Sequence, residues 1–167
     1  MKIAIISDVH NNATNLKKVL DYCAKNKIAK IICCGDLSSN ETLDFLNDNF
    51  AGEIFYAIGN AEYGQLNGME NISEYKKTKI FSEFGEAKIT DKNVAFVHYP
   101  REAKKLAESG KYDFVFYGHT HKPWTEEVGK CEMLNPGTTG GEIYPPTFAV
   151  WNVEAGKFDL IRVHDLK

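Results

Sequence analysis

Nearly continuous apolar runs alternate with amphipathic stretches in the first third of the chain. The apolar runs are typical of strands buried on both faces. The stretches between them repeat apolar side chains every three or four residues, as a helix with one buried face does. This β-α-β-α-β order favours right-handed crossovers and a parallel sheet, with Asn12 or Thr14 as the cap of the first helix. The predicted elements are strands 2–7, 29–34 and 53–58 and helices 14–26 and 41–49.

The pattern changes after residue 60. Residues 61–85 are polar with scattered apolar positions and predict a loop with at most one short helix. The remaining strands are short and closely spaced, and only one amphipathic stretch, after Pro100, interrupts them. This β-richer half predicts a second sheet packed face to face on the first, with helices outside. The further predicted elements are strands 87–90, 94–98, 114–117, 124–128, 131–134, 147–153 and 158–164 and helix 101–109.

Composition and charge narrow the class of protein. With 43% hydrophobic residues and a formal net charge of -3, the chain has no general attraction to nucleic acid or anionic membranes. Its length predicts a single domain, residues 1–167. Met1 leads directly into a strand, and no apolar run approaches the roughly 18 residues of a membrane span, so we expect a cytoplasmic protein. Buried reduced thiols are expected at Cys23, Cys33, Cys34 and Cys131, which lack a Cys-x-x-Cys spacing.

Side chains of metal-binding type follow the predicted strands at the point where each strand ends. Taken singly, an Asp-x-His pair, or an Asp or Asn after a glycine, usually has an ordinary explanation as a turn or surface residue. These fragments share one format, however, and open α/β sheets place their ligands at the carboxyl ends of parallel strands, so we expect them to meet at one edge. The candidate metal ligands are Asp8, His10, Asp36, Asn60, His98, His119 and His121. His164 has no such partner and is interpreted as structural.

The order of these fragments resembles a known family. Asp-x-His, Gly-Asp, Gly-Asn, a strand-end His and Gly-His-x-His run from Met1 to at least Gly137 as they do in the calcineurin-like metallophosphoesterases, most of all the small YfcE-type phosphodiesterases. The resemblance implies an α/β fold, a four-layer αββα sandwich of two mixed sheets flanked by helices, with a dinuclear metal centre. In the implied arrangement, Asp36 bridges two ions, of which the first is held by Asp8, His10 and His121 and the second by Asn60, His98 and His119.

The donor types agree with that implication. Carboxylate, amide oxygen and imidazole suit borderline divalent ions, so we expect two ions per chain, with Mn first and Ni, Fe, Co or Zn as alternatives. Two such ions about 3.5 to 4 Å apart can share a carboxylate and a hydroxide, which is the nucleophile for in-line attack at phosphorus. We take Asp36, Asn60 and His98 as the catalytic residues.

Three neighbouring positions bear on the substrate. Asn12 stands where the family motif has an asparagine and is expected to contact a phosphate oxygen. Asn11 replaces the glycine of that motif, a change that the backbone can accept because asparagine tolerates the left-handed conformation better than most residues. Tyr99 is expected either to narrow the entrance, to stack on a base, or to have a simple core or surface role. Ala61 stands where many family members have a histidine that protonates the leaving group, so diesters with good leaving groups are the expected substrates.

These features predict a metal-dependent phosphodiesterase that acts on a small phosphodiester. One alternative is a non-catalytic interaction scaffold, because the small retromer subunit shares this fold without a complete set of active-site groups; the other is a phosphomonoesterase. A cyclic nucleotide, an oligonucleotide end and a phospholipid headgroup diester all remain open as substrates, and nucleic acid enters only in that capacity. A homodimer is the commonest form among homo-oligomers, but the sequence leaves the oligomeric state open.

Overall fold

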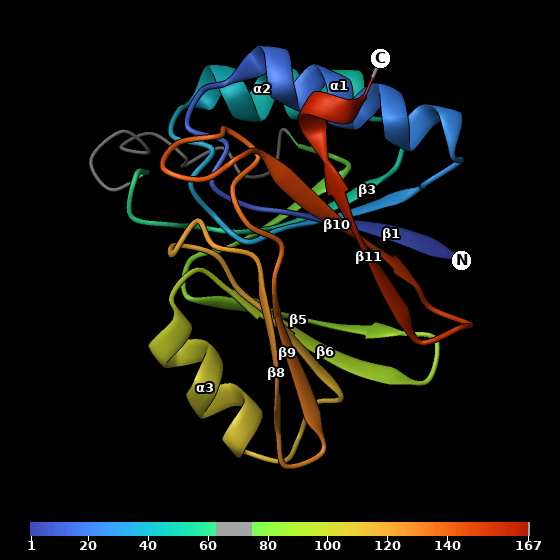
Figure 1. Ribbon diagram of the computed structural model, residues 1–167, viewed down its shortest axis with the longest axis vertical. Helices are drawn as coiled ribbons and strands as arrows, with labels where there is room; N and C mark the ends of the chain where they lie inside the picture. Colours follow the sequence, from blue (N-terminus) through green and yellow to red (C-terminus); the bar gives the residue numbers. More distant parts are fainter. Residues whose placement is uncertain (63–74, 167) are drawn as a thin grey trace.

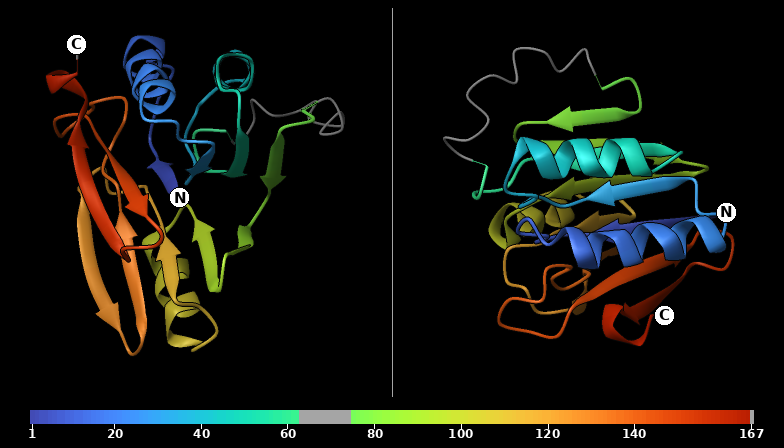
Figure 2. Two further views of the ribbon diagram at one scale, coloured as in Figure 1. Left: turned by 90° about the vertical axis from the view of Figure 1, so that its right-hand side faces the viewer. Right: turned by 90° about the horizontal axis from the view of Figure 1, so that it is seen from above.

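The computed structural model describes residues 1–62 and 75–166 and arranges them in four layers (Figure 1). Two β-sheets lie face to face in the middle. Helices α1 (Ala13–Lys25) and α2 (Asn40–Asn49) lie side by side over the outer face of the first sheet (Figure 2), and α3 (Pro100–Glu108) covers the outer face of the second. The predicted αββα sandwich is therefore confirmed.

The first sheet contains six strands in the order β11-β10-β1-β2-β3-β4. β1 to β4 are parallel, while β10 and β11 extend the sheet with antiparallel pairing beside β1. The loops that follow β1, β2 and β3 consequently open at the same edge of this sheet. Its strands are β1 (Lys2–Ile6), β2 (Lys30–Cys33), β3 (Glu53–Ala57), β4 (Thr78–Phe81), β10 (Thr147–Asn152) and β11 (Lys157–Arg162).

The second sheet contains five strands in the order β5-β6-β7-β9-β8. Its three central strands, β6, β7 and β9, are parallel, and β5 and β8 pair antiparallel at its two edges. This sheet therefore also gathers the loops that follow its parallel strands at one edge. Its strands are β5 (Phe84–Ile89), β6 (Lys92–Val97), β7 (Phe114–Phe116), β8 (Trp124–Val128) and β9 (Cys131–Asn135).

Apolar side chains fill the three spaces between the layers. Along β1, alternate residues face opposite sides of the sheet, so Ile5 packs between the two sheets while Ile6 packs under α1 and α2. Trp151 is fully buried between the sheets, with its ring centroid 4.8 Å from that of Phe114. The third space lies between α3 and the second sheet, where Ala103 is buried. Because central strands have apolar neighbours on both faces, their sequences are apolar without interruption.

The structure corrects the prediction of a loop over residues 61–85. Residues 78–81 form β4, which pairs with β3, and β5 begins at Phe84. The strand was missed because Thr78 is its only fully buried residue, so its sequence shows no apolar run. The part of the loop prediction that falls on residues 63–74 lies outside the described residues.

The C-terminal strand is also shorter than predicted. β11 ends at Arg162, and His164 lies in a short 3-10 helix, Val163–Asp165, that contacts α1.

The four cysteines are buried free thiols, and burial raises the pKa of Cys131 to about 11. Among the described residues, no helix combines the length and the apolar character that crossing a bilayer requires.

Candidate metal centre

All seven candidate ligands follow parallel strands, but these strands belong to two sheets rather than to one. The loops after β1, β2 and β3 of the first sheet carry Asp8, His10, Asp36 and Asn60, and the loops after β6 and β7 of the second carry His98, His119 and His121. The expectation of a meeting at one sheet edge is corrected in this respect. The site lies where the corresponding edges of two face-to-face sheets come together.

Tight backbone turns aim these side chains at one another. Five of the seven candidate ligands have positive φ angles, between 47° for His10 and 69° for His119. Non-glycine residues in this region are uncommon, although Asp, Asn and His occur there more often than others, and each costs of order 1 kcal/mol or more. Asn11 also has a positive φ, 60°, as expected of an asparagine in place of glycine. A concentration of such residues on adjacent loops is a feature of functional sites.

Two glycines permit the close approach of these loops. A Cβ atom on Gly59 would lie 2.1 Å from Oδ1 of Asp36, and one on Gly118 would lie 1.9 Å from the Ser7 hydroxyl and 2.8 Å from Oδ2 of Asp8. Each glycine directly precedes a candidate ligand in the chain. The glycines of the Gly-Asn and Gly-His fragments are thus required because another ligand's side chain occupies the space beside them.

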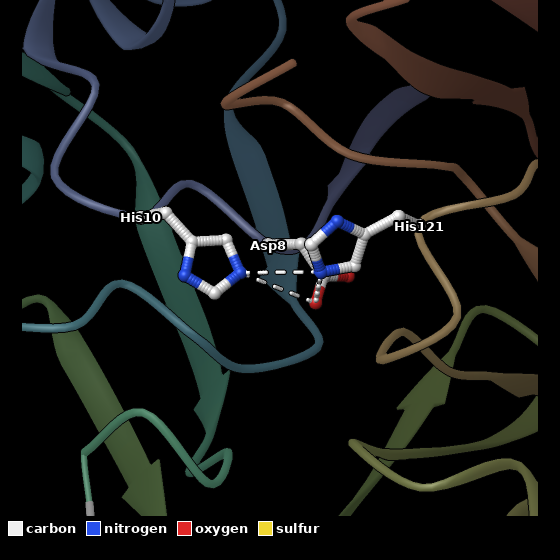
Figure 3. A group of neighbouring side chains, drawn as sticks. All are labelled: Asp8, His10 and His121. Atoms are coloured by element: carbon white, nitrogen blue, oxygen red, sulfur yellow. Dashed lines mark hydrogen bonds and ion pairs between the residues drawn. The ribbon is translucent and has the colours of Figure 1, made fainter. Parts of the chain in front are cut away.

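The first cluster of donors joins Asp8, His10 and His121 (Figure 3). The Nε2 atoms of the two histidines are 3.2 Å apart, and Oδ1 of Asp8 lies 3.3 Å from Nε2 of His121 and 3.9 Å from Nε2 of His10. The other ring nitrogens are held from behind: Nδ1 of His10 lies 3.3 Å from the Ser38 hydroxyl, and Nδ1 of His121 lies 3.2 Å from the Glu142 carbonyl oxygen. Both rings therefore present Nε2 to the same space.

The second cluster joins Asp36, Asn60, His98 and His119. Oδ1 of Asn60 lies 3.0 Å from Nε2 of His98 and 2.9 Å from Nδ1 of His119, and those two nitrogens are 3.2 Å apart. Nδ1 of His98 lies 2.8 Å from the Cys34 carbonyl oxygen, so this nitrogen donates and Nε2 is left to face the cluster.

Asp36 lies between the two clusters. Its Oδ2 atom is 3.7 Å from Nε2 of His10 and 3.4 Å from Nε2 of His98, while Oδ1 accepts a hydrogen bond of 2.8 Å from the Ala61 amide. One carboxylate oxygen therefore faces both groups of imidazoles. Asp8 is the second shared carboxylate, since it also belongs to a group with Asp36 and His98.

Burial and the carboxylates shift the pKa values of the site in both directions. Burial opposes ionisation of Asp36, but the bond to His98 outweighs it and lowers the Asp36 pKa. Burial disfavours charge on His98 too, yet its contact with Asp36 raises its pKa. The bond to Asp8 raises the pKa of His121 to about 8, whereas burial and the neighbouring His98 lower that of His119. The carboxylates thus create a field that attracts positive charge.

The donor set fits divalent cations on the evidence of its own geometry. With Nδ1 of His98 donating to Cys34, Nε2 of the neutral ring presents its lone pair to the oxygens of Asn60 and Asp36 at 3.0 and 3.4 Å. Three acceptors pointing at one another repel unless a proton or a cation lies between them. Carboxylate, amide oxygen and imidazole together are ligands for borderline divalent ions.

Glu62 connects two loops of the candidate site, and the sequence did not reveal this role. It is 1% exposed, and its carboxylate accepts hydrogen bonds from the backbone amides of Asp36, Ser38 and Gly59 at 3.2, 2.7 and 2.6 Å. It therefore ties the loop after β2 to the loop after β3. The only signal in the sequence is an acidic residue two positions after Asn60, which by itself does not distinguish a buried clamp from a surface side chain.

The structure gives Asn12 a scaffold role beside its predicted contact with phosphate. Its Oδ1 accepts a hydrogen bond from the Asn15 amide and caps α1, while its Nδ2 donates to the Gly140 carbonyl at 2.8 Å. Asn15 also donates to that carbonyl. Asn12 thus holds the loop that carries Glu142 against the start of α1.

Tyr99 borders the second cluster. Its ring centroid is 4.9 Å from that of His119 and 5.0 Å from that of His98, both at steep angles. The ring stands beside the candidate ligands and is half-buried. This position agrees with a side chain that shapes the entrance, as the sequence interpretation allowed.

An αββα sandwich with paired carboxylate and imidazole clusters at the meeting edges of its sheets defines a metal-binding phosphoesterase class. Residues 1–156 match the family model of the calcineurin-like phosphoesterase superfamily domain, and the chain belongs to this superfamily. The family predicted from the sequence is confirmed.

Individual relatives agree. The chain is 27% identical over 161 residues to phosphodiesterase MJ0936 of Methanocaldococcus jannaschii, covering 95% of this chain and 96% of that protein. It superimposes on the solved structure of an archaeal phosphodiesterase with a TM-score of 0.87 at 27% identity, covering 97% and 99% of the two chains. Vacuolar protein sorting 29 from Cryptosporidium parvum shares the fold, with a TM-score of 0.67 at 20% identity and coverage of 96% and 95%.

Proposed function

We propose that this chain is a metal-dependent phosphodiesterase that binds two divalent ions and hydrolyses a small phosphodiester. One observation carries the proposal: Oδ2 of Asp36 faces His10 at 3.7 Å and His98 at 3.4 Å, with a separate set of donors around each histidine. The similarity to phosphodiesterase MJ0936 supports the choice of reaction. Asp8, His10 and His121 would hold one ion, Asn60, His98 and His119 the other, and Asp36 both.

Divalent ions held by these residues would supply Lewis acidity, which lowers the pKa of a bound water molecule and polarises a phosphoryl oxygen. The protein's own contribution is positioning. Ser38 and the carbonyls of Cys34 and Glu142 fix the orientation of three imidazole rings. The Ala61 amide holds one oxygen of Asp36 and leaves the other directed at the two clusters. Asp36, Asn60 and His98 remain the residues that we assign to catalysis.

The leaving group receives no proton from the position after Asn60. The Ala61 side chain is a methyl group, and its amide is already bonded to Asp36. Turnover should therefore depend on the stability of the departing oxyanion. Diesters with phenolate leaving groups are expected to react faster than alkyl esters.

The test is hydrolysis of bis-p-nitrophenyl phosphate by protein loaded with Mn, and separately with Ni, Fe, Co or Zn. We expect p-nitrophenolate release that requires the metal and that exceeds the release from p-nitrophenyl phosphate. Protein with bound metal and no diesterase activity would favour the interaction scaffold. The chain shares its fold with vacuolar protein sorting 29, so the fold alone is compatible with that alternative. Faster turnover of the monoester would favour a phosphomonoesterase.

A further inference from the structure

A cavity of about 400 Å³ opens beside the candidate metal centre. Parts of the chain that are far apart in sequence form it: the end of β3, the turn between β4 and β5, the end of β6 and one face of α3. The volume lies in the lower part of the range for small-molecule sites. Its lining residues are Ile58, Ser82, Glu83, Phe84, Val97, Tyr99, Glu102, Lys105 and Leu106.

Tyr99 is the wall that the cavity shares with the candidate metal centre. The ring lines the cavity and also stands 4.9 Å from the His119 ring and 5.0 Å from the His98 ring. Two further lining residues are close in sequence to candidate ligands: Ile58 precedes Asn60 by two residues, and Val97 directly precedes His98. A phosphodiester with phosphorus at the centre can therefore extend one of its two ester groups into the cavity.

The lining indicates the chemistry of that ester group. Ile58, Phe84 and Leu106 offer apolar surface, and the Phe84 side chain is 38% exposed, so it is accessible to a ligand. Two aromatic rings, those of Phe84 and Tyr99, suit a planar ring more than an alkyl chain.

The net negative charge of the side chains that line the cavity disfavours binding of a further anion there. Glu83 and Glu102 carry two negative charges against the one positive charge of Lys105. A second phosphate or a carboxylate would meet net repulsion there. The polar groups of Ser82 and Lys105 can instead bond to the edge of an uncharged heterocycle.

We propose that this cavity binds an uncharged, ring-bearing ester group of the substrate, of the kind found in a nucleoside. The proposal rests on the proposed function, because it places the phosphate at the candidate metal centre. It narrows the substrate to a diester with one nucleoside-like arm, and it disfavours a long oligonucleotide, whose further phosphates would face Glu83 and Glu102.

The first test measures binding without catalysis. Adenosine is titrated into ¹⁵N-labelled metal-free protein, and we expect amide shifts for residues 82–84 and 97–106. In Leu106→Trp, whose indole would fill the cavity, and in Phe84→Ala, which removes an exposed wall, we expect at least about tenfold weaker binding. Lys104→Trp on the same helix is the matched control, since Lys104 is exposed and lines no part of the cavity. Shifts confined to other regions, or binding unaffected by both cavity variants, would overturn the proposal.

The second test uses two diesters with the same leaving group on metal-loaded protein. We expect kcat/KM for the p-nitrophenyl ester of thymidine 5′-phosphate to exceed that for methyl p-nitrophenyl phosphate by about tenfold or more, and Leu106→Trp to reduce this ratio. Equal kcat/KM values for the two esters would overturn the assignment of the cavity and leave the proposed function standing. Hydrolysis of neither ester would overturn the proposed function, and the adenosine titration would then decide the cavity alone.

Discussion

Asp36 is the residue whose carboxylate lies between the two donor clusters. One of its oxygens faces His10 and His98, and the other accepts a hydrogen bond from the Ala61 amide. Asp36→Asn keeps the shape and removes the charge. We expect it to lower kcat/KM for bis-p-nitrophenyl phosphate by more than about 100-fold, beyond the range usual for residues behind the ligands.

The comparison set for Asp36→Asn consists of alanine variants at the other six candidate ligands, assayed at saturating metal. Each of them is expected to lose less activity, because in the proposed arrangement Asp36 is the one residue that holds both ions. His164→Ala serves as the control: its side chain lies in the 3-10 helix near the C-terminus, and activity should be unchanged. A larger loss in His164→Ala than in Asp36→Asn would refute the site.

Glu62 provides a separate prediction because it is not one of the candidate metal ligands. Three backbone amides donate to its two carboxylate oxygens, and Gln in its place has a single acceptor oxygen. We expect Glu62→Gln to weaken metal binding by about 10- to 100-fold in calorimetric titration. The free energy of unfolding should fall by about 1–3 kcal/mol, because at least one buried amide loses its partner.

A matched control for this variant is Glu53→Gln. Glu53 is also acidic and lies at the start of β3, the strand before Glu62, but its partners are the half-buried side chain of Lys30 and the exposed side chain of Lys79. Surface ion pairs contribute little. If both variants bound metal as tightly as the parent chain, Glu62 would be a structural residue without influence on the centre.

At the scale of single residues, the sequence predicted the candidate metal ligands but not the side chains that hold their loops in place. Asp8 and His10 could be anticipated from their donor types and their position after a predicted strand, and Asn11 because asparagine tolerates the left-handed backbone conformation that it adopts. Glu62 could not, since its role depends on where the amides of Asp36 and Gly59 point, and that follows only from the packing of two loops.

At the scale of elements, Asn12 connects the start of α1 to the loop after β9. Its side chain caps the helix and also bonds to Gly140, two residues before Glu142, whose carbonyl orients His121. Asn12→Ala should therefore cost about 0.5–2 kcal/mol of stability, the usual value of a cap. It should also weaken metal binding, because the Glu142 carbonyl loses its support.

Ser39→Ala separates these two effects. Ser39 caps α2 in the same way, but its hydroxyl accepts a hydrogen bond from the Thr42 amide within that helix. Chemical denaturation and metal titration of both variants give the comparison: a similar loss of stability in each, with weaker metal binding in Asn12→Ala alone. An Asn12→Ala variant with unchanged metal affinity and a raised KM for the diester would instead support the phosphate contact.

The buried central strands of the first sheet are the elements that the sequence predicted most directly. β1, β2 and β3 are apolar on both faces and were recognised as strands from sequence. β4 has Thr78 as its one fully buried residue and is held by backbone pairing with β3, which leaves no trace in side-chain patterning. β11, at the outer edge of its sheet, has a mostly exposed sequence, and its end was placed two residues too far along the chain.

At the scale of the whole molecule, the centre joins the two sheets. Asp8 and His10 follow β1 of the first sheet, and His121 follows β7 of the second, yet Nε2 of His10 and Nε2 of His121 are 3.2 Å apart. A cation bound there would connect the sheets at their shared edge. The family resemblance implied this meeting, whereas periodicity alone indicated one sheet edge, because strand patterns do not reveal which sheet a strand joins.

Metal loading should therefore stabilise the fold as a whole. At a free metal concentration 100 times Kd, one site adds about 2.7 kcal/mol to the free energy of unfolding, which corresponds to a rise in Tm of roughly 5 to 10 °C for a chain of this size. Differential scanning calorimetry with Mn and with a chelator measures the difference. Asp36→Asn should reduce the rise, since its replacement weakens both clusters.

Hydrogen exchange distinguishes a cation that joins the sheets from one that binds to a single loop. If both sheets contribute ligands, metal should slow exchange of amides near the ends of β1 and β7 together, and His121→Ala should reduce the protection near both strands without abolishing it. The reason is that Asn60, His98 and His119 are still in place in that variant, so the second cluster persists and still includes a residue of the loop after β7. Protection limited to the loops of the first sheet in the parent chain would show that the second sheet's histidines bind no metal, and the dinuclear arrangement would then have to be abandoned.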